Sequence, residues 1–506
     1  MTQPERRNVL FITADQWRGD ALGCTGHPAV RTPRFDAFAA ESVRFARHYS
    51  NASPCGPSRA SLLTGLVLHN HRSVRNGVPL DRRHTTVAVE ARKAGVAPAL
   101  FGYTDTAPDP RGLPPLDPAL FSYEGIAPGF DPVCPMIDSA DPWGDDLRRR
   151  GFLPAGEPVS GLYAPPDGDP HGPARFPADL SETAFLTDRA LSWMAGQGSR
   201  PWFAHVSYLR PHPPWIGPEP WHSLISPDSV PPPIRAATPA LEGAVHPWLA
   251  WRLSTFPGKH WVHGRKLDPK TIGGEELHWL RAVYYGLIAE VDHHIGRLLD
   301  GVRALGQWDE TLIIVTSDHG ELIGDHWMFG KEGWFDPCFH VPLAIRWPGG
   351  AESRTVERFT EHIDLMPTIL DWLRVPIPRQ CDGVSLRPWL EGHVPPVWRR
   401  HAHFAYDFRD VATATPEHAL HQQPDQCTMT ILRGETTKYV HFTALPPLFF
   451  DLADDPGELC DRSRDPAYQG QVLEHAQALL SWRLEHDERT LTNMWLGRQG
   501  VVVRDE

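Results

Sequence analysis

Short apolar runs alternate with amphipathic stretches along residues 8–376 of the chain. The runs at 8–13 (NVLFIT), 97–103, 201–208 and 311–316 (TLIIVT) have the length and composition of strands covered on both faces. The clearest helical stretch lies at 277–299, where Leu277, Leu280, Tyr284, Leu287 and Val291 recur at three- and four-residue steps. Strands that alternate with helices predict an α/β fold with a large, mainly parallel sheet sandwiched by helices.

Three further helices are predicted from the residues that begin or end them. Thr32 as N-cap and Pro33 at the first position open one of these helices. The second lies within 53–65, where Pro57 suits a first helical turn because the missing N–H has no partner there. The third covers 87–94 and is stopped by Gly95.

Two long stretches within residues 1–376, at 104–177 and 211–274, lack this rhythm. Both are rich in Pro, Gly, Asp and Trp, and both directly follow a predicted strand. Loops at the carboxyl ends of strands form the binding sites of α/β folds. We therefore expect them to be the walls and lids of a pocket in a catalytic domain that spans 1–376. Plain surface insertions are the alternative.

Beyond residue 376 the pattern changes. The segment 377–486 predicts a smaller α+β subdomain, with a strand-like stretch at 439–452 and a final helix at 468–486. A tail at 487–506 carries Met494, Trp495 and Leu496, apolar residues that a free terminus would expose unfavourably. This tail is expected to be an arm that docks across a subunit interface of a homodimer or homotetramer. Packing onto its own chain is the alternative.

Composition narrows the classes of partner. The 506 residues include 62 acidic and 49 basic side chains, and the net charge of −13 argues against nucleic acid. No apolar stretch approaches the length of a membrane span, and the start of the chain lacks a signal-peptide pattern, so no membrane partner and a cytoplasmic location are expected. The seven scattered cysteines fit a reducing compartment without a disulfide framework.

Polar residues follow the predicted strands at the points where each strand ends. They are Asp15 and Gln16 after the first strand, Tyr103 and Asp105 after the second, His212 after the third, and Asp318 and His319 after the fourth. In a doubly wound sheet these ends converge on one crevice. Asp15, Asp318 and His319 supply two carboxylates and an imidazole, which are ligand types that a divalent cation binds.

The segment 53–65, SPCGPSRASLLTG, places a cysteine at a helix start. Backbone N–H groups and the positive end of the helix dipole would face whatever lies in front of Cys55. Arg59 follows one turn later and adds a fixed guanidinium. The group is suited to chemistry on an anion, while the alternative is an inert cysteine buried at the beginning of a helix.

This Cys-x-Pro-Ser-Arg segment with its Leu-Thr-Gly ending resembles the signature of the sulfatases, a branch of the alkaline phosphatase superfamily. The resemblance implies an alkaline phosphatase-like fold and oxidation of Cys55 to formylglycine by a formylglycine-generating enzyme. The hydrated aldehyde offers one hydroxyl for attack and a second to break down the covalent ester. It also implies one divalent metal held by Asp15, Gln16, the modified Cys55, Asp318 and His319. Many sulfatases have Asp and Asn in place of Gln16 and His319, and this departure favours Mn²⁺ over Ca²⁺.

The same resemblance assigns roles in catalysis and substrate binding. Arg59 would hold the formylglycine and the substrate's charge, while His212 and Lys331 would contact the sulfuryl oxygens and assist the leaving group. Substrate binding would further involve Asn76, Tyr103 and Asp105. His69 and His71 are candidates to reach the gem-diol, with a role in capping a helix end as the alternative.

Segments across almost the whole chain, among them GLVLHNHRSVRNGVPLDRRH, SYLRPHPPW and TSDHGELIGDH, look like the phosphonate monoester hydrolase and bacterial arylsulfatase group. Where those hydrolases tend to carry threonine this chain has Asp105, and a carboxylate there would repel dianions more than monoanions. The first expectation is an arylsulfatase that also cleaves phosphonate monoesters and phosphodiesters by double displacement. The alternatives are a primary phosphonate monoester hydrolase or phosphodiesterase, a metal-dependent phosphatase or phosphomutase of the same superfamily, and a non-enzymatic anion-binding protein.

Overall fold

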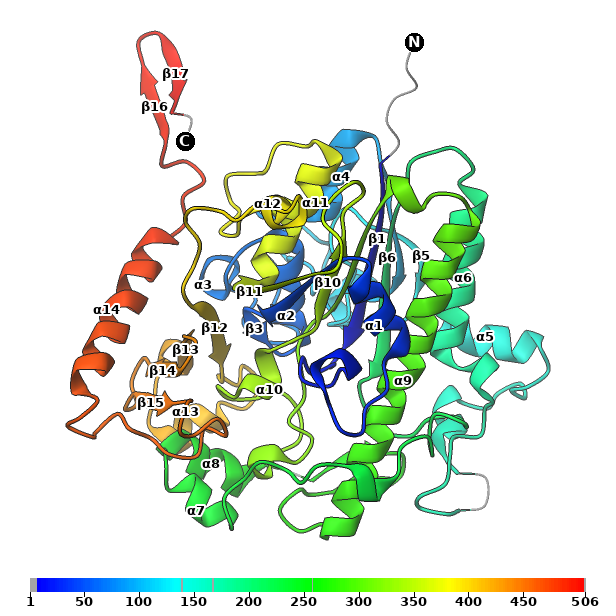
Figure 1. Cartoon of the computed structure of the whole chain (residues 1–506), viewed down its shortest axis with the longest axis horizontal. Coiled ribbons are helices and arrows are strands. Elements are labelled where there is room, and N and C mark those ends of the chain that lie inside the picture. Colours follow the sequence, from blue (N-terminus) through cyan, green and yellow to red (C-terminus); the bar gives the residue numbers. More distant parts are fainter. Residues whose placement is uncertain (1–6, 138–139, 166–167, 257, 505–506) are drawn as a thin grey trace.

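An eight-stranded sheet forms the centre of the molecule (Figure 1). The computed structural model describes residues 7–137, 140–165, 168–256 and 258–504. The strand order is β11-β2-β10-β9-β1-β6-β4-β5, and β10 runs antiparallel to both of its neighbours. The strands are β1 (Asn8–Asp15), β2 (Val43–Tyr49), β4 (Pro98–Gly102), β5 (Asp131–Pro135), β6 (Phe203–Pro211), β9 (Thr311–Ser317), β10 (Leu343–Arg346) and β11 (Arg354–Glu361). The predicted α/β architecture with a mainly parallel sheet is confirmed.

Helices cover both faces of this sheet, because successive apolar side chains of β1 point to opposite faces and both faces must be buried. Leu10 and Ile12 join one apolar core, and Val9 and Phe11 join a second core on the other face. The first core includes side chains from α1 (Pro33–Ala40), α6 (Glu182–Gly196) and α9 (Gly274–Ala304). The second includes side chains from α2 (Cys55–Thr64), α4 (Val87–Ala91), α11 (Leu365–Leu373) and α12 (Arg387–Leu390). Shorter helices are α3 (Leu68–His71), α5 (Asp141–Arg149), α7 (Pro239–Gly243), α8 (Pro247–Thr255) and α10 (Asp336–Phe339).

The predicted helix at 277–299 is longer and more deeply buried than its apolar stripe indicates. It is α9, with 31 residues, and it packs against β6, α1 and α6. Polar side chains such as Arg281, Glu290 and Asp292 are buried along it as well as the predicted apolar ones. A polar residue inside a large protein is buried when a partner is available, and Asp292 accepts hydrogen bonds from the backbone N–H groups of Arg34 and Phe35.

Two local predictions differ from the structure. Thr32 precedes α1 as predicted, but its hydroxyl donates to Asp36 and accepts from Gly23 N instead of capping the helix. The stretches 104–177 and 211–274 lack the sequence rhythm of strands and helices, yet the first contains α5 and the strand β5, and the second contains α7, α8, β7 (Lys259–Val262) and β8 (Arg265–Leu267). The sequence of β5, DPVCP, carries two prolines, which a strand tolerates at the edge of a sheet, and β5 is the terminal strand.

A smaller sheet forms the C-terminal part, as expected for an α+β subdomain. Its order is β15-β14-β13-β12-β3, with β12 (Ala402–Asp407), β13 (Thr428–Arg433), β14 (Thr437–Phe442) and β15 (Leu448–Asp451). The last strand, β3 (Ala52–Ser53), comes from the segment directly before Cys55 and pairs with β12 in parallel. The short helix α13 (Thr415–Leu420) lies in this part, and α14 (Gln469–Glu485) contacts β14. The C-terminal sheet is therefore attached to the start of α2.

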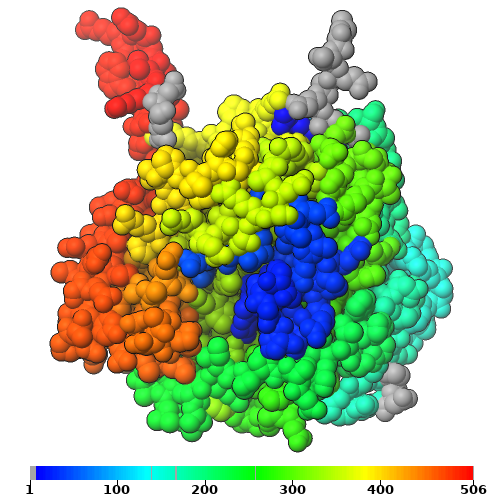
Figure 2. Space-filling model, in the orientation of Figure 1, coloured from blue at the N-terminus to red at the C-terminus, as the bar shows by residue number. Residues whose placement is uncertain are grey.

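The chain ends in a hairpin that projects from the body of the protein (Figure 2). Its strands are β16 (Met494–Gly497) and β17 (Gly500–Val503), and Trp495 and Leu496 are 67% and 77% exposed. A second small hairpin, β7 (Lys259–Val262) and β8 (Arg265–Leu267), lies within the long loop before α9. All seven cysteines are free. Among the described residues, no helix combines the length and the apolar composition that crossing a membrane requires.

Candidate active site

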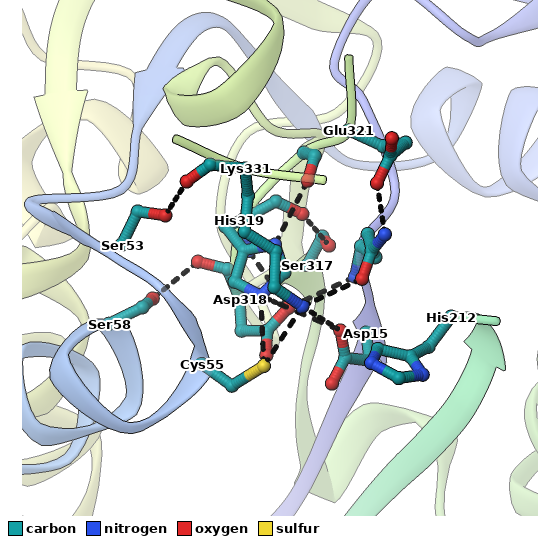
Figure 3. A network of polar contacts seen from close by, with 12 residues as sticks. Asp15, Ser53, Cys55, Ser58, His212, Ser317, Asp318, His319, Glu321 and Lys331 are labelled. Atoms are coloured by element: carbon teal, nitrogen blue, oxygen red, sulfur yellow. Dashed lines mark hydrogen bonds and ion pairs between the residues drawn. The ribbon is translucent and has the colours of Figure 1, made fainter. Parts of the chain in front are cut away.

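Four ligand atoms converge where β1 and β9 end and α2 begins (Figure 3). Asp15 is the last residue of β1, Asp318 and His319 follow β9, and Cys55 is the first residue of α2. Their ligand atoms all lie within 4.8 Å of one another, and all four residues are buried. His319 Nε2 lies 3.2 Å from Cys55 Sγ and 3.6 Å from an oxygen of each carboxylate. The structure thus brings four of the five predicted ligands, all except Gln16, close enough together to bind one metal ion.

The electrostatics of this cluster fit a divalent cation. Asp15 Oδ1 is buried and accepts no hydrogen bond within the described part of the chain. Burial, followed by repulsion from Asp15, raises the pKa of Asp318 to about 6. Burial lowers the pKa of His319 to about 3, so the imidazole is neutral and can offer a lone pair. A bound cation would be coordinated by Asp15 Oδ1 and would relieve the repulsion between the Asp15 and Asp318 carboxylates.

Arg59 contacts the Asp15 and Asp318 carboxylates from the side that faces away from the cavity. It is 1% exposed, its Nε donates to Asp318 Oδ2 at 2.9 Å, and its Nη2 lies 3.5 Å from Asp15 Oδ2. Nη1 donates to the Tyr103 carbonyl at 3.0 Å and to Ser207 Oγ at 2.7 Å. The guanidinium therefore fixes the ligand geometry, and within the described residues it is not part of the cavity wall. Tyr103 contributes a hydroxyl that donates to Asp15 Oδ2.

Lys331 stands over the cysteine from the opposite side of the cluster. Its Nζ donates to Gln16 Oε1 at 2.7 Å and to Cys55 Sγ at 3.1 Å, and it lies 3.9 Å from Asp15 Oδ1. Burial lowers the pKa of Lys331, but attraction to the Asp15 and Asp318 carboxylates opposes this, so the ammonium group stays charged. Ser53 Oγ donates to the backbone carbonyl of Lys331 and positions this segment.

Glu321 is a residue of this network that the sequence did not reveal. Its Oε1 accepts the backbone N–H groups of Ile323 at 2.7 Å and Gly330 at 2.6 Å, and its Oε2 accepts from Gln16 Nε2. Burial raises the pKa of Glu321 to about 7, so above that pH this side chain is a carboxylate. A carboxylate only accepts and an ammonium only donates, so Glu321 and Lys331 together fix the orientation of the Gln16 amide. The Gln16 oxygen, expected as a metal ligand, is engaged by Lys331. The only sequence signal for Glu321 is its place two residues after His319.

His212 follows β6 and lines the same cavity. Its Nδ1 donates to the carbonyl of Pro213 at 2.7 Å, which leaves Nε2 as an acceptor in the neutral ring. Burial and the nearby Lys331 ammonium lower the pKa of His212 to about 4. At neutral pH the ring therefore carries no proton on Nε2.

The cluster lies at the bottom of a cavity of about 500 Å³. Both long loops contribute to its walls, through Asp105, Tyr123 and Glu124 on one loop and Phe256, Lys259 and Trp261 on the other. Asn76 also lines the cavity and accepts the backbone N–H of Gly56 at 2.9 Å, at the start of α2. Burial raises the pKa of Asp105 to about 7, which weakens the expected repulsion of dianions at neutral pH.

Two candidate residues lie away from the cavity. His71 Nε2 is hydrogen-bonded to Ser61 Oγ at 3.0 Å, and its Nδ1 accepts from Ser73 N at 3.1 Å just after α3. His69 Nε2 contacts the backbone carbonyl of His486 at 3.0 Å. The gem-diol contact considered for these histidines is not made, because their rings face the end of α3 and the segment after α14.

Comparisons with known proteins find relatives along the whole chain. The sulfatase family model matches residues 7–375, and the model for the N-sulphoglucosamine sulphohydrolase C-terminal region matches 324–485. The chain is 41% identical to the multifunctional alkaline phosphatase superfamily protein PehA of Trinickia caryophylli, over 99% of both chains. It is 25% identical to an arylsulfatase of Clostridium perfringens, over 96% of both.

Solved structures show the same pattern of likeness. The phosphonate monoester hydrolase of Agrobacterium radiobacter superposes with a TM-score of 0.96 and 44% identity, over 99% of this chain and all of that one. The phosphonate monoester hydrolase of Silicibacter pomeroyi has a TM-score of 0.93 and 40% identity, over 99% of both chains. These relatives resemble this chain along its full length.

Proposed function

The chain belongs to the sulfatase family and is a hydrolase of sulfate or phosphonate esters; from this premise we propose that it prefers phosphonate monoesters, with aryl sulfates second. The sequence alone favours the opposite order, with aryl sulfates first. Phosphonate monoesters are placed first because two solved relatives, at 44% and 40% identity, are phosphonate monoester hydrolases, while the arylsulfatase is 25% identical. Both substrates are monoanionic esters, so one cavity suits both.

The observation that carries the proposal is the buried Cys55 at the centre of the cluster. Burial raises the pKa of its thiol, so the sulfur stays protonated and is a poor nucleophile as it stands. Conversion to formylglycine by a formylglycine-generating enzyme is therefore part of the proposal. The hydrated aldehyde would supply one hydroxyl for attack and another to release the product by double displacement.

The proposed metal site consists of Asp15, Asp318, His319 and the side chain at position 55, which together supply hard oxygen and neutral nitrogen donors. A divalent cation bound there would supply a Lewis acid that polarises a substrate oxygen and lowers the pKa of a hydroxyl group. One imidazole among the donors favours Mn²⁺ over Ca²⁺. Arg59 keeps the two carboxylates in place whether or not the substrate is bound.

Lys331 is the group best placed to stabilise charge on the substrate. It is charged, and its Nζ already lies 3.1 Å from the sulfur of Cys55. His212 is neutral with an acceptor at Nε2, so it orients the substrate and does not protonate the leaving oxygen at neutral pH. Asn76 Nδ2, Tyr103 and Asp105 would complete the substrate contacts. The sum of the reaction is ester plus water giving an alcohol or phenol plus the sulfate or phosphonate.

The C-terminal hairpin is proposed as a contact between copies of this chain. Its exposed side chains include Trp495, Leu496, Val501 and Val502, which a single molecule leaves in contact with water. A second copy in a homodimer or homotetramer is the partner that every molecule of the protein has available.

Two measurements test the proposed function. The mass of the Cys55 peptide, from protein produced with a formylglycine-generating enzyme, should show an aldehyde or its hydrate in place of the thiol. The modified protein should then cleave a phenylphosphonate monoester with a higher kcat/KM than an aryl sulfate. Equal turnover by protein with an unmodified thiol would exclude the formylglycine mechanism.

A further inference from the structure

Three cations surround one carboxylate at the mouth of the active-site cavity. Arg75, Lys259 and Glu332 line the cavity, and Arg252 lies next to Glu332. These residues come from distant parts of the chain: the loop after α3, the strand β7, the segment after Lys331 and the helix α8. Lys259 is exposed, whereas Cys55 at the bottom is 4% exposed, so this group lies at the outer end of the cavity.

The carboxylate of Glu332 is hydrogen-bonded to one of the three cations, Arg252. Both Nε and Nη2 of Arg252 donate to the two oxygens of Glu332, the second at 2.8 Å, in a bidentate pair. Arg75 donates hydrogen bonds to Tyr406 OH at 3.4 Å and to the Asp407 carbonyl at 3.3 Å, and its guanidinium lies 5.9 Å from the centroid of the Tyr406 ring. Within the described ranges neither Arg75 nor Lys259 forms an ion pair, and the single negative charge of Glu332 acts on all three cations, so the group keeps a net positive charge.

The direction of attack decides which part of a substrate meets these charges. An in-line displacement places the leaving group on the side of the phosphorus or sulfur away from the nucleophile. The nucleophile would be at position 55, at the bottom of the cavity, so the leaving group points toward the mouth. Phe256, Trp261 and Tyr406 line the same region and offer aromatic surfaces to an aryl group.

We propose that Arg75 and Lys259 form a subsite for an anionic substituent on the leaving group, so that the preferred substrates are aryl esters whose phenol carries a carboxylate. This inference deepens the proposed function and rests on it. Asp105 and Glu124 also line the cavity and would repel an anion on their side. Lys331 lies beside the reacting group at the bottom, so a second anion at the mouth would lie beside Arg75 and Lys259. A carboxylate there would pair with a planar guanidinium on one side and an ammonium on the other.

The test compares two substrates of nearly equal size, 4-carboxyphenyl and 4-carbamoylphenyl phenylphosphonate. The measured quantity is the ratio of their kcat/KM values in each protein, because a loss common to both substrates cancels in that ratio. The intrinsic reactivity of the two phenols is the same for every variant, so it cancels when ratios are compared between proteins. We expect Arg75→Gln with Lys259→Gln to lower the ratio at least about tenfold, as the loss of charge-assisted hydrogen bonds implies. Added salt should lower the ratio in the unsubstituted enzyme more than in the double variant.

Two matched controls lie outside the cavity lining. Arg72 is exposed and lies 3.5 Å from Asp425, and Lys266 is exposed on β8. Arg72→Gln with Lys266→Gln removes the same two charges from nearby positions and should leave the ratio unchanged. An equal fall in the control, or no fall in the Arg75 and Lys259 variant, would overturn the subsite.

A binding measurement separates this inference from the proposed function. In Cys55→Ala protein, which has no nucleophile at position 55, the dissociation constants of the same two esters can be compared by calorimetry without turnover. We expect the carboxylate ester to bind at least about tenfold more tightly, and this preference to be lost with Arg75→Gln and Lys259→Gln. Turnover of neither ester by the modified enzyme would refute the proposed function alone. Equal binding of both esters would refute the subsite alone.

Discussion

Replacing Glu321 with glutamine tests whether the orientation of one amide controls the position of Lys331. In the structure Glu321 accepts from Gln16 Nε2, and the opposite end of the Gln16 amide accepts from Lys331 at 2.7 Å. In Glu321→Gln, Oε1 still accepts from Ile323 and Gly330. The new NH₂ group then faces the NH₂ group of Gln16, so the Gln16 amide must turn and present NH₂ to the Lys331 ammonium.

The size of the effect follows from the bond that is lost. The contact from Lys331 to Gln16 is a hydrogen bond with a charged donor, and such bonds contribute about 1.5–3 kcal/mol. A repelled Lys331 no longer holds its position beside residue 55, so kcat/KM should fall roughly 10- to 150-fold at 25 °C. The two backbone hydrogen bonds to residue 321 are retained, so the melting temperature should change little.

A second substitution provides the rescue. Gln16→Glu combined with Glu321→Gln exchanges the two groups and conserves both the charge and the pattern of hydrogen bonds. The amide introduced at position 321 then donates to the carboxylate introduced at position 16, and the other oxygen of that carboxylate accepts from Lys331. Steady-state kinetics on a phenylphosphonate ester should show that the exchange restores at least about tenfold of the loss. If Glu321→Gln keeps kcat/KM within about twofold of the parent, the positioning role of Glu321 is refuted.

Three other perturbations probe the fold and the assembly. A Cβ atom at Gly320 would lie 1.9 Å from the carbonyl oxygen of Pro337, so Gly320→Ala should lower the free energy of unfolding by about 3 kcal/mol or more in urea titrations. The control is Gly196→Ala, because a Cβ atom there meets nothing within 4 Å. Equal stability of the two variants would contradict this prediction. Burial raises the pKa of Asp292 from 3.8 to about 7, so the folded state keeps a proton that the unfolded chain releases, and stability is lost as pH rises from about 4 to 7. Asp292→Asn should flatten this fall by at most about 1.4 kcal/mol per pH unit, and an unchanged slope would exclude the assignment. Deleting 487–506 should reduce the molar mass in light scattering to that of the monomer, whereas an unchanged mass would rule out the hairpin as the contact between copies.

The parts of the fold that the sequence predicted well are those with strong periodicity. The buried strands at 8–13 and 311–316 and the helix at 277–299 appear as β1, β9 and α9 because apolar spacing and burial agree there. β5 was missed because its edge position permits prolines that usually argue against a strand. β3 was missed for a different reason: its two residues form a strand only through pairing with Ala405 and Tyr406, far away in the sequence.

The candidate site was predictable to the extent that strand ends carry its residues. Asp15, His212, Asp318 and His319 all lie at or just after strand ends, so topology alone brings them to one edge of the sheet. The roles of Arg59 and Gln16 depended on which partners their side chains meet, and no spacing reveals that Arg59 faces the two carboxylates from behind. Arg75 and Glu332 belong to the cavity only because distant loops meet at its mouth.

The pairing of β3 with β12 has a consequence for the order of events during synthesis. Cys55 is buried, and the strand directly before it is completed by residues that the ribosome adds much later. The maturation enzyme of the proposed mechanism would therefore have to reach Cys55 before β3 pairs with β12. About 350 residues separate the two strands, which at typical rates of synthesis leaves roughly 20–70 s. Formation of the C-terminal sheet would thus end the period in which the proposed oxidation of this cysteine can take place.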